Sequence, residues 1–305
     1  MTSVLYDAPG PRAIVTSRVI SIVGGVLIAA GLVWLILALG APKVSANGAV
    51  QPGLWAPSRW DVFNDRAVWR ALGIGALNTL RMAGVAAVFA LAFGVLFSFA
   101  RASDTRWIRI PATVVLEFVR GMPVLLMMLF ILLVFSTGSF WAGVAALAVY
   151  NGAIIGEALR AGIKSLPRGQ REAGLAIGLT PISTRFRIEF PQAFRQMLPI
   201  IIAQLVVLLK DTSLSFLVGY RELLREGVNL TNFFGQRYAF SFFLVVLAIY
   251  LTMNLLLSWV ARIISRRTGS KSGGLMTAGK APVKPADPEV IYPAALGSRM
   301  GGGGV

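Results

Sequence analysis

Six long runs of apolar residues, separated by charged and turn-forming segments, dominate the chain. The uncharged runs cover residues 19–39, 82–100, 121–135, 138–156, 196–209 and 238–261. A helix needs about 20 mainly apolar residues to cross a bilayer. Four runs meet that length, whereas 121–135 and 196–209 meet it only by including Glu117 and Arg120, or Lys210 and Asp211. The pattern therefore predicts an all-α integral membrane protein with six transmembrane helices.

The composition supports a membrane protein and excludes several chemistries. Hydrophobic residues make up 56% of the 305 residues and charged residues only 14%, well below the roughly 25% of soluble domains. The chain contains no cysteine and no histidine. Disulfides, thiolate nucleophiles, histidine general bases and His/Cys zinc sites are therefore excluded. We expect no catalytic residue and no metal site.

The net charge of +16 raises the question of a nucleic-acid partner, which the distribution of charge answers. With six spans, the segments on the side of the two termini hold 19 of the lysines and arginines, whereas the segments on the other side hold seven. Such an excess is typical of cytoplasmic loops. The charge therefore predicts a multi-pass plasma-membrane protein with both termini in the cytoplasm, and no nucleic acid is needed to explain it.

The ends of the chain differ from its centre. Residues 1–18 are predicted to be a cytoplasmic segment, and residues 19–40 an extra, uncleaved transmembrane helix, because the 21-residue run exceeds the core of a signal peptide. Residues 41–71 contain Trp55, Trp60 and Trp69, which favours an external connection at the membrane interface. Residues 266–305 are rich in Gly, Ser, Pro and Lys and predict a disordered cytoplasmic tail.

A charged stretch, GQREAGLAIG at 169–178, interrupts this apolar chain. It lies in the predicted cytoplasmic loop 161–195, and the local signals indicate two short helices. Pro167 suits the first turn of one helix and Gly178 its left-handed C-terminal cap. Thr180 suits the N-cap of the next helix, with Pro181 at its first position.

Two further prolines, Pro191 and Pro199, are expected to limit continuation of the second helix. A bent pair of amphipathic helices on the cytoplasmic side forms a docking surface for another protein. The same pattern also suits a membrane-surface element held by anionic lipid. The residues alone leave both interpretations open.

A resemblance of this stretch to a known family favours the docking surface over the lipid-bound element. EAGLAIG at 172–178 closely matches the EAA loop of permease subunits of ATP-binding-cassette (ABC) importers, with Gly174 in place of the second alanine. Four other segments also resemble this family: FVRGMPVLLMMLF at 118–130, EALRAGIKSLPRGQREAG at 157–174, FPQAFRQMLP at 190–199 and LLKDTSL at 208–214. In two of them the usual residue is replaced, by Met122 for threonine and by Phe190 for leucine.

Together these motifs cover roughly residues 72–262 and occur in the family's order. Within the family they look most like the polar-amino-acid uptake branch, and within it like actinobacterial glutamate permeases. The resemblance implies a five-helix type I importer core at 72–265, outside which the extra first helix lies with no assigned role.

The resemblance also implies which partners the chain has. The EAA loop would be the coupling helix that docks on a dimer of ATPase subunits, which bind ATP and magnesium. A second permease chain, a paralogue or another copy, and an extracytoplasmic substrate-binding protein complete the expected complex. This chain has no G-x-x-x-x-G-K-[ST] phosphate loop, so ATP hydrolysis is expected on the partner. The expected coupling residues are Gly169, Gln170, Arg171, Glu172, Ala173, Gly174, Gly178 and Leu179.

Small Ala173 and Gly174 would allow close approach of another backbone, while Arg171 and Glu172 could pair with charges of the partner.

Polar residues within the spans are candidates for the substrate path. They are Arg81, Glu117, Arg120, Asn151, Gln204, Lys210, Asp211, Thr212 and Ser213. The pairs Glu117/Arg120 and Glu157/Arg160 have i,i+3 spacing, so mutual neutralisation is favoured over substrate contact. The stretch 210–213 is expected to mark a helix break that lines a polar path, because discontinuous helices form such sites in transporters.

The sequence thus predicts the permease of an ATP-driven importer for a polar amino acid, glutamate in the first instance. An ion-coupled secondary transporter is the alternative, although it predicts internal repeats and midplane carboxylates, and no clear repeat is present. A membrane enzyme has little support without histidine or cysteine.

Overall fold

A computed structural model describes residues 10–44, 48 and 50–268 of the chain. Most of the predicted tail, from residue 269 on, and residues 1–9 of the predicted N-terminal segment therefore lie outside the described residues.

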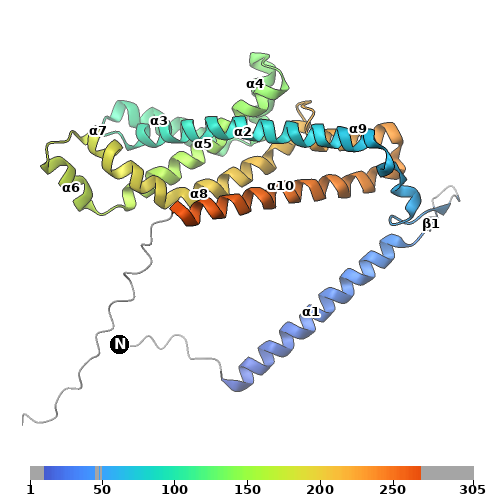
Figure 1. Cartoon of the computed structure of the whole chain (residues 1–305). Coiled ribbons are helices and arrows are strands. Elements are labelled where there is room, and N and C mark those ends of the chain that lie inside the picture. The colour runs from blue at the N-terminus through green and yellow to red at the C-terminus, as the bar shows by residue number, and fades with distance from the viewer. Residues whose placement is uncertain (1–9, 45–47, 49, 269–305) are drawn as a thin grey trace, which may run out of the picture. The chain divides into compact units, whose positions relative to one another are not determined.

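The described chain is almost entirely helical (Figure 1). The α-helices are α1 Pro11–Gly40, α2 Arg66–Ala102, α3 Arg106–Gly121, α4 Val124–Phe135, α5 Ser139–Ser165, α6 Arg168–Ala176, α7 Pro181–Thr184, α8 Phe190–Asp211, α9 Leu223–Phe234 and α10 Ala239–Thr268. Short helical turns are η1 Pro57–Arg59, η2 Asp61–Asn64, η3 Arg185–Glu189, η4 Thr212–Phe216 and η5 Gln236–Tyr238, and η3 is a π-helix. Strands β1 Lys43–Val44 and β2 Val50–Gln51 pair antiparallel.

Among the described residues, five helical segments are long and apolar enough to span a membrane, or six if α3 and α4 together form one span. The third predicted span is broken into two helices. The chain bends by 106° between α3 and α4, and Figure 1 shows α4 turning away from α3. Met122 has extended backbone angles directly before Pro123. Proline disfavours the helical conformation in the residue before it and lacks an N–H, which explains the break.

Pro191 and Pro199, the two prolines of α8, do not limit the helix as expected. Helix α8 starts at Phe190, carries Pro191 in its first turn and continues through Pro199 to Asp211. The π-turn η3 joins α7 to α8, so residues 181–216 form one helical segment. A proline in the first turn needs no N–H partner, and an interior proline is tolerated in membrane helices because neighbouring groups satisfy the freed carbonyl. The predicted second short helix is therefore the start of the long one.

Helix α5 lies at the centre of the core and packs against α2, α4 and α8. Its contact with α2 relies on glycines. A Cβ atom on Gly152 would lie 2.8 Å from Phe93 Cβ, and one on Gly94 would lie 2.6 Å from Ile155 Cγ2. Small residues allow membrane helices to approach closely, so these positions fix the spacing of α2 and α5.

The connection 41–71 packs through its tryptophans. Trp55 Nε1 donates to Ile36 O of α1 at 2.9 Å, and Trp60 Nε1 donates to Leu54 O at 3.1 Å. The rings of Trp55 and Trp60 stack with their centroids 6.4 Å apart. None of the residues in the apolar stretch of α1 is buried against the described chain. The hydrogen bond from Trp55 to Ile36 O is the recorded side-chain hydrogen bond between α1 and the connection.

Candidate functional site

The turn after α6 has the geometry of a Schellman motif. Gly178 has a φ of +83°, which a glycine adopts without the cost of a Cβ. Its N–H donates to Leu175 O at 3.0 Å, and the N–H of Leu179 donates to Gly174 O at 3.1 Å. These two bonds satisfy the last carbonyls of α6. The predicted left-handed cap at Gly178 is confirmed.

The following helix begins where the sequence predicts. The hydroxyl of Thr180 accepts a hydrogen bond from Ser183 N at 3.3 Å, and Pro181 occupies the first turn. Pro167, expected inside the first turn of α6, instead occupies the N-cap position directly before Arg168. The two caps hold α6 and α7 as a bent pair.

Gly174 has a different role from the one expected. It is buried, and a Cβ atom there would lie 2.6 Å from Thr184 Cγ2 and 3.0 Å from Ile188 Cδ1. Its small size therefore serves the packing of α6 on α7 and η3 of the same chain, rather than a partner. The other expected contact residues are exposed, except for half-buried Leu179: Gly169, Gln170, Arg171, Glu172, Ala173 and Gly178.

Exposed apolar side chains accompany these residues. Ile177 is 75% exposed, Ile182 68% and Phe186 52%. An exposed apolar patch with a polar rim is typical of a protein interaction site. The bent pair thus presents both charged and apolar groups outward.

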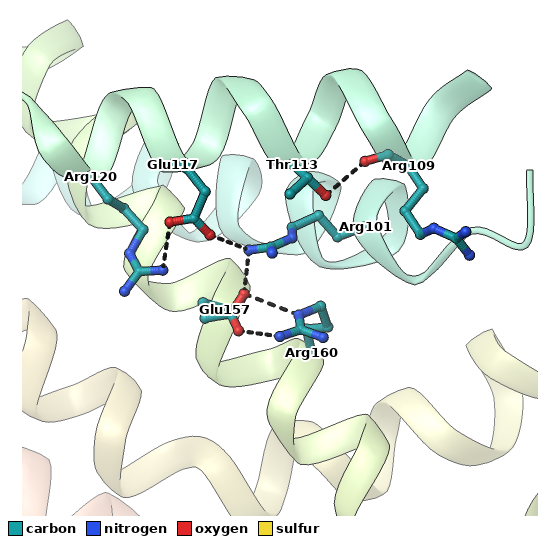
Figure 2. A network of polar contacts seen from close by, with 7 residues as sticks. All are labelled: Arg101, Arg109, Thr113, Glu117, Arg120, Glu157 and Arg160. Atoms are coloured by element: carbon teal, nitrogen blue, oxygen red, sulfur yellow. Dashed lines mark hydrogen bonds and ion pairs between the residues drawn. The ribbon is translucent and has the colours of Figure 1, made fainter. Parts of the chain in front are cut away.

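A charged network joins three helices near this pair (Figure 2). Arg101 Nη1 of α2 lies 2.6 Å from Glu157 Oε2 of α5 and 3.4 Å from Glu117 Oε1 of α3. Glu157 also pairs with Arg160, and Arg120 Nη1 lies 3.7 Å from Glu117 Oε2. Both i,i+3 pairs form as predicted.

Arg101 was missed as a partner of these pairs because its contact with Glu157 spans 56 positions. No local spacing signals such a contact. The network places Glu117 and Arg120, two of the predicted path residues, in an ion-pair cluster.

A second group of path residues lies within the core. Gln204 Nε2 of α8 donates to Asn151 Oδ1 of α5 at 2.8 Å, and Asn151 Nδ2 donates to Leu147 O at 2.8 Å. Asn151 is fully buried. This polar pair therefore joins two spans within an apolar interior.

A third group lies where α8 ends. Helix α8 tightens into the 3₁₀ turn η4 after Asp211, but residues 181–216 remain one helical segment, so the helix break predicted at 210–213 is not present. The hydroxyls of Thr212 and Ser213 donate to Leu209 O at 2.7 Å and Lys210 O at 2.9 Å. These side chains satisfy carbonyls at the end of the helix.

Lys210 and Ser213 line a cavity of about 500 Å³ together with Tyr250 and Asn254 of α10. Sequence reasoning missed the latter two because they are uncharged polar residues in a long apolar run. Arg81 lies apart from this cavity, with its guanidinium 5.3 Å from the Phe140 ring. The predicted path residues thus form separate groups rather than one cluster.

Glu222 is a further buried polar residue that the sequence did not single out. Its carboxylate accepts hydrogen bonds from Leu224 N at 2.8 Å, Arg225 N at 2.7 Å and the hydroxyl of Tyr250. It is the N-cap of α9 and is fully buried. Burial raises the pKa of the Glu222 carboxyl above its ordinary value, although these hydrogen bonds oppose the shift. Within residues 10–44, 48 and 50–268, no three acidic side chains gather as metal ligands.

Comparison with known proteins identifies the family. Residues 90–270 match the family of binding-protein-dependent transport system inner membrane components. The chain belongs to this family. It is the multi-pass, membrane-spanning permease component of an ABC transporter, and the ATPase of such a transporter is a separate subunit. Family membership implies an ATPase and a substrate-binding protein as partners.

Two related permeases can be aligned with this chain over most of its length. The glutamate transport system permease protein GluD of Corynebacterium glutamicum is 33% identical over 251 residues, which cover 79% of this chain and 89% of the relative. The glutamine transport system permease protein GlnP of Escherichia coli strain K12 is 32% identical over 67% of this chain and 97% of its own.

Solved structures show the same fold. The structure described as an amino acid ABC transporter with histidines has a TM-score of 0.59 and 28% identity, covering 65% of this chain and 94% of that one. An inward-facing methionine ABC transporter, MetNI, has a TM-score of 0.58 at 20% identity, covering 68% of this chain and 100% of that one. The second likeness concerns the fold alone.

Proposed function

We propose that this permease imports a polar L-amino acid, glutamate in the first instance, by alternating access. An extracytoplasmic binding protein delivers the substrate, and two ATPase subunits bind ATP and magnesium on the cytoplasmic side, where both termini lie. A second permease chain completes the pore, because one five-helix core is too small to enclose the path alone. The similarity to the glutamate permease over 79% of the chain supports this substrate.

The observation that carries the proposal is the continuous helical segment 181–216. One end of it packs on α6, through the contact of Gly174 with Thr184, and the other end reaches the cavity lined by Lys210. A displacement of α6 by a bound ATPase therefore acts on the same helix that carries the polar residues at the cavity. The exposed charged and apolar groups of the bent pair form the docking surface.

The cavity at the end of α8 suits one end of an amino acid. Lys210 offers an ammonium group and Asn254 an amide group, whereas the hydroxyls of Ser213 and Tyr250 already donate to Lys210 O and Glu222. A carboxylate forms charge-assisted hydrogen bonds with such donors. The buried pair Asn151–Gln204 supplies further polar groups deeper in the core, whereas Glu117 and Arg120 stabilise helix packing.

Uptake of labelled glutamate into proteoliposomes tests the proposal. The reconstituted complex holds the permease chains, the ATPase and the binding protein, with ATP inside. Lys210→Gln is expected to reduce uptake at least about tenfold, because a lost charge-assisted hydrogen bond costs about 1.5–3 kcal/mol. Arg120→Gln is the matched control and should retain most uptake, since Arg120 pairs with Glu117. Wild-type kinetics in Lys210→Gln would contradict the assignment.

A second measurement separates the ATP-driven importer from the ion-coupled transporter. The ATPase should co-purify with the wild-type permease and be lost when both Glu172→Ala and Gly178→Val are introduced. Sustained uptake by this chain alone in liposomes without ATP would overturn the importer and favour coupling to an ion gradient.

A further inference from the structure

A strongly basic cavity lies between the coupling helix α6 and the turn that joins α2 to α3. Its volume is about 620 Å³, and its lining includes seven lysine and arginine side chains but only three carboxylates. Ligand pockets in proteins have volumes of about 300–1,000 Å³. The cavity is therefore large enough for a small ligand, and its charge favours an anion.

The carboxylates of the lining do not satisfy its most buried cation. Arg185 is only 8% exposed, and its Nε has no hydrogen-bond partner among the described residues. The nearest recorded carboxylate oxygens, from Glu189 and Asp104, lie 3.8 Å from its nitrogens, beyond hydrogen-bond distance. A buried donor without a partner costs free energy, so this guanidinium is poised for another acceptor.

Other cations of the lining also lack partners. Arg109, Lys164 and Arg168 form no side-chain hydrogen bond or ion pair within the part of the chain that the structure describes. Among the described residues, the recorded ion-pair partner of Arg171 is Asp104, with an N–O distance of 3.6 Å. These side chains come from α3, α5 and α6, so three helices direct unpaired positive charge into one cavity.

We propose that this cavity binds a phosphate-bearing anion. A phosphate group carries several acceptor oxygens and more than one negative charge, and it accepts the forked hydrogen bonds of arginine. It could therefore bond to Arg185 and to the side chains of α3 and α6 at once. The proposal goes beyond amino-acid import and does not rest on the substrate.

The bound anion would be the headgroup of an anionic phospholipid or a soluble phosphate. A lipid is one candidate because α3 also carries an apolar groove that could hold acyl chains. Exposed Trp107, Ile110 and Val114 line this groove. In either case the anion ties α6 to the α2–α3 turn. Its occupancy would therefore change how freely the coupling helix moves against the membrane helices.

The test measures anion binding to the full-length permease in nanodiscs of neutral phosphatidylcholine. Inorganic pyrophosphate is the soluble probe, followed by isothermal calorimetry at low and high salt. Replacing part of the lipid by phosphatidylglycerol is the second probe, followed by the thermal unfolding midpoint and by lipid retention in native mass spectrometry. Binding should weaken as salt rises.

The variant that carries the test is the double change Arg109→Gln and Arg168→Gln. Both residues are exposed and without side-chain partners in the described chain, so the fold should persist, as an unchanged midpoint without probe would verify. The matched control is Arg187→Gln with Arg195→Gln, which removes the same charge from exposed positions outside both the cavity and the apolar groove on α3. The first variant should weaken binding at least tenfold, and the control less than twofold.

The outcomes separate the sources. Binding of pyrophosphate alone supports a soluble phosphate, and stabilisation by phosphatidylglycerol alone supports a lipid headgroup. The absence of both effects, or an equal loss in the two double variants, would overturn the proposal. Displacement of the probe by one equivalent of the ATPase would also overturn it, because carboxylates of the ATPase would then fill the cavity. Failure of glutamate uptake leaves these results unaffected.

Discussion

Arg101 Nη1 lies 2.6 Å from Glu157 Oε2, which joins the last turn of α2 to the C-terminal half of α5. The Arg101 side chain is 12% exposed and the Glu157 side chain 25%. Ion pairs of this kind are costly to break from one side, because the remaining charge stays partly buried. The pair therefore stabilises the region from which α6 and α7 project.

Replacing Arg101 should lower the stability of the permease. Arg101→Gln removes the shared partner of Glu117 and Glu157, and we expect a loss of about 1–3 kcal/mol, the cost of leaving a partly buried charge with fewer hydrogen bonds. Thermal unfolding of the purified protein in detergent measures this. Arg106→Gln, an exposed arginine on the adjoining helix, is the control and should leave the midpoint unchanged. Equal midpoints for the two variants would contradict the role of Arg101.

The packing of Gly174 predicts a selective effect in the coupling loop. In Gly174→Ala the new methyl group would lie 2.6 Å from Thr184 Cγ2, whereas in Gly169→Ala it would meet no atom within 4 Å. Overpacking costs about 1–3 kcal/mol, so α6 should loosen from α7 only in the first variant. We expect a several-fold loss of ATP-driven uptake in Gly174→Ala and near-normal uptake in Gly169→Ala. Similar uptake by the Gly174→Ala and Gly169→Ala variants would contradict this interpretation.

The local features of the coupling loop could be predicted because they depend on neighbouring residues. Gly178 has the left-handed conformation that a residue without a Cβ adopts readily, and the hydroxyl of Thr180 caps α7. The break expected at 210–213 is instead a change from α8 to the 3₁₀ turn η4 within one helical segment. The bend at Pro123 was missed, although the proline is visible, because the apolar pattern continues across it.

Features that depend on the packing of distant segments could not be predicted. The burial of Gly174 depends on the return of η3 against α6, and the partner of Arg101 lies on another helix. Pro199 shows the reverse case, since a strong local signal for helix termination is overridden inside a long membrane helix.

The pair Asn151–Gln204 offers a way to separate packing from transport. Gln204→Leu leaves the buried Asn151 Oδ1 without its recorded donor, at a cost of about 1–3 kcal/mol. The double variant with Asn151→Leu removes both partners and should recover part of that stability. Unfolding midpoints measure this effect, and uptake assays follow in parallel. If the pair lines the substrate path, the double variant stays impaired in uptake; recovered uptake would assign the pair to packing alone.

The buried carboxyl of Glu222 predicts a dependence of stability on pH. Burial favours its neutral form and raises its pKa, against the opposing hydrogen bonds from Tyr250, Leu224 and Arg225. A carboxyl whose pKa is higher in the folded state binds its proton more tightly there. Its contribution is thus fully present below the ordinary glutamate pKa of about 4.3 and is lost as pH rises through the folded-state pKa.

Comparison of Glu222→Gln with the wild type isolates this contribution. The amide stays neutral at every pH and keeps an oxygen that can accept from the N–H of Leu224 or Arg225. The unfolding midpoint of the wild type should therefore fall relative to that of the variant as pH rises from about 4 toward neutrality. The neighbouring ion pair of Glu226 with Arg221 is left unchanged by the substitution. A difference in midpoint that stays constant with pH would show that Glu222 is ionised in the folded protein as readily as in the unfolded chain.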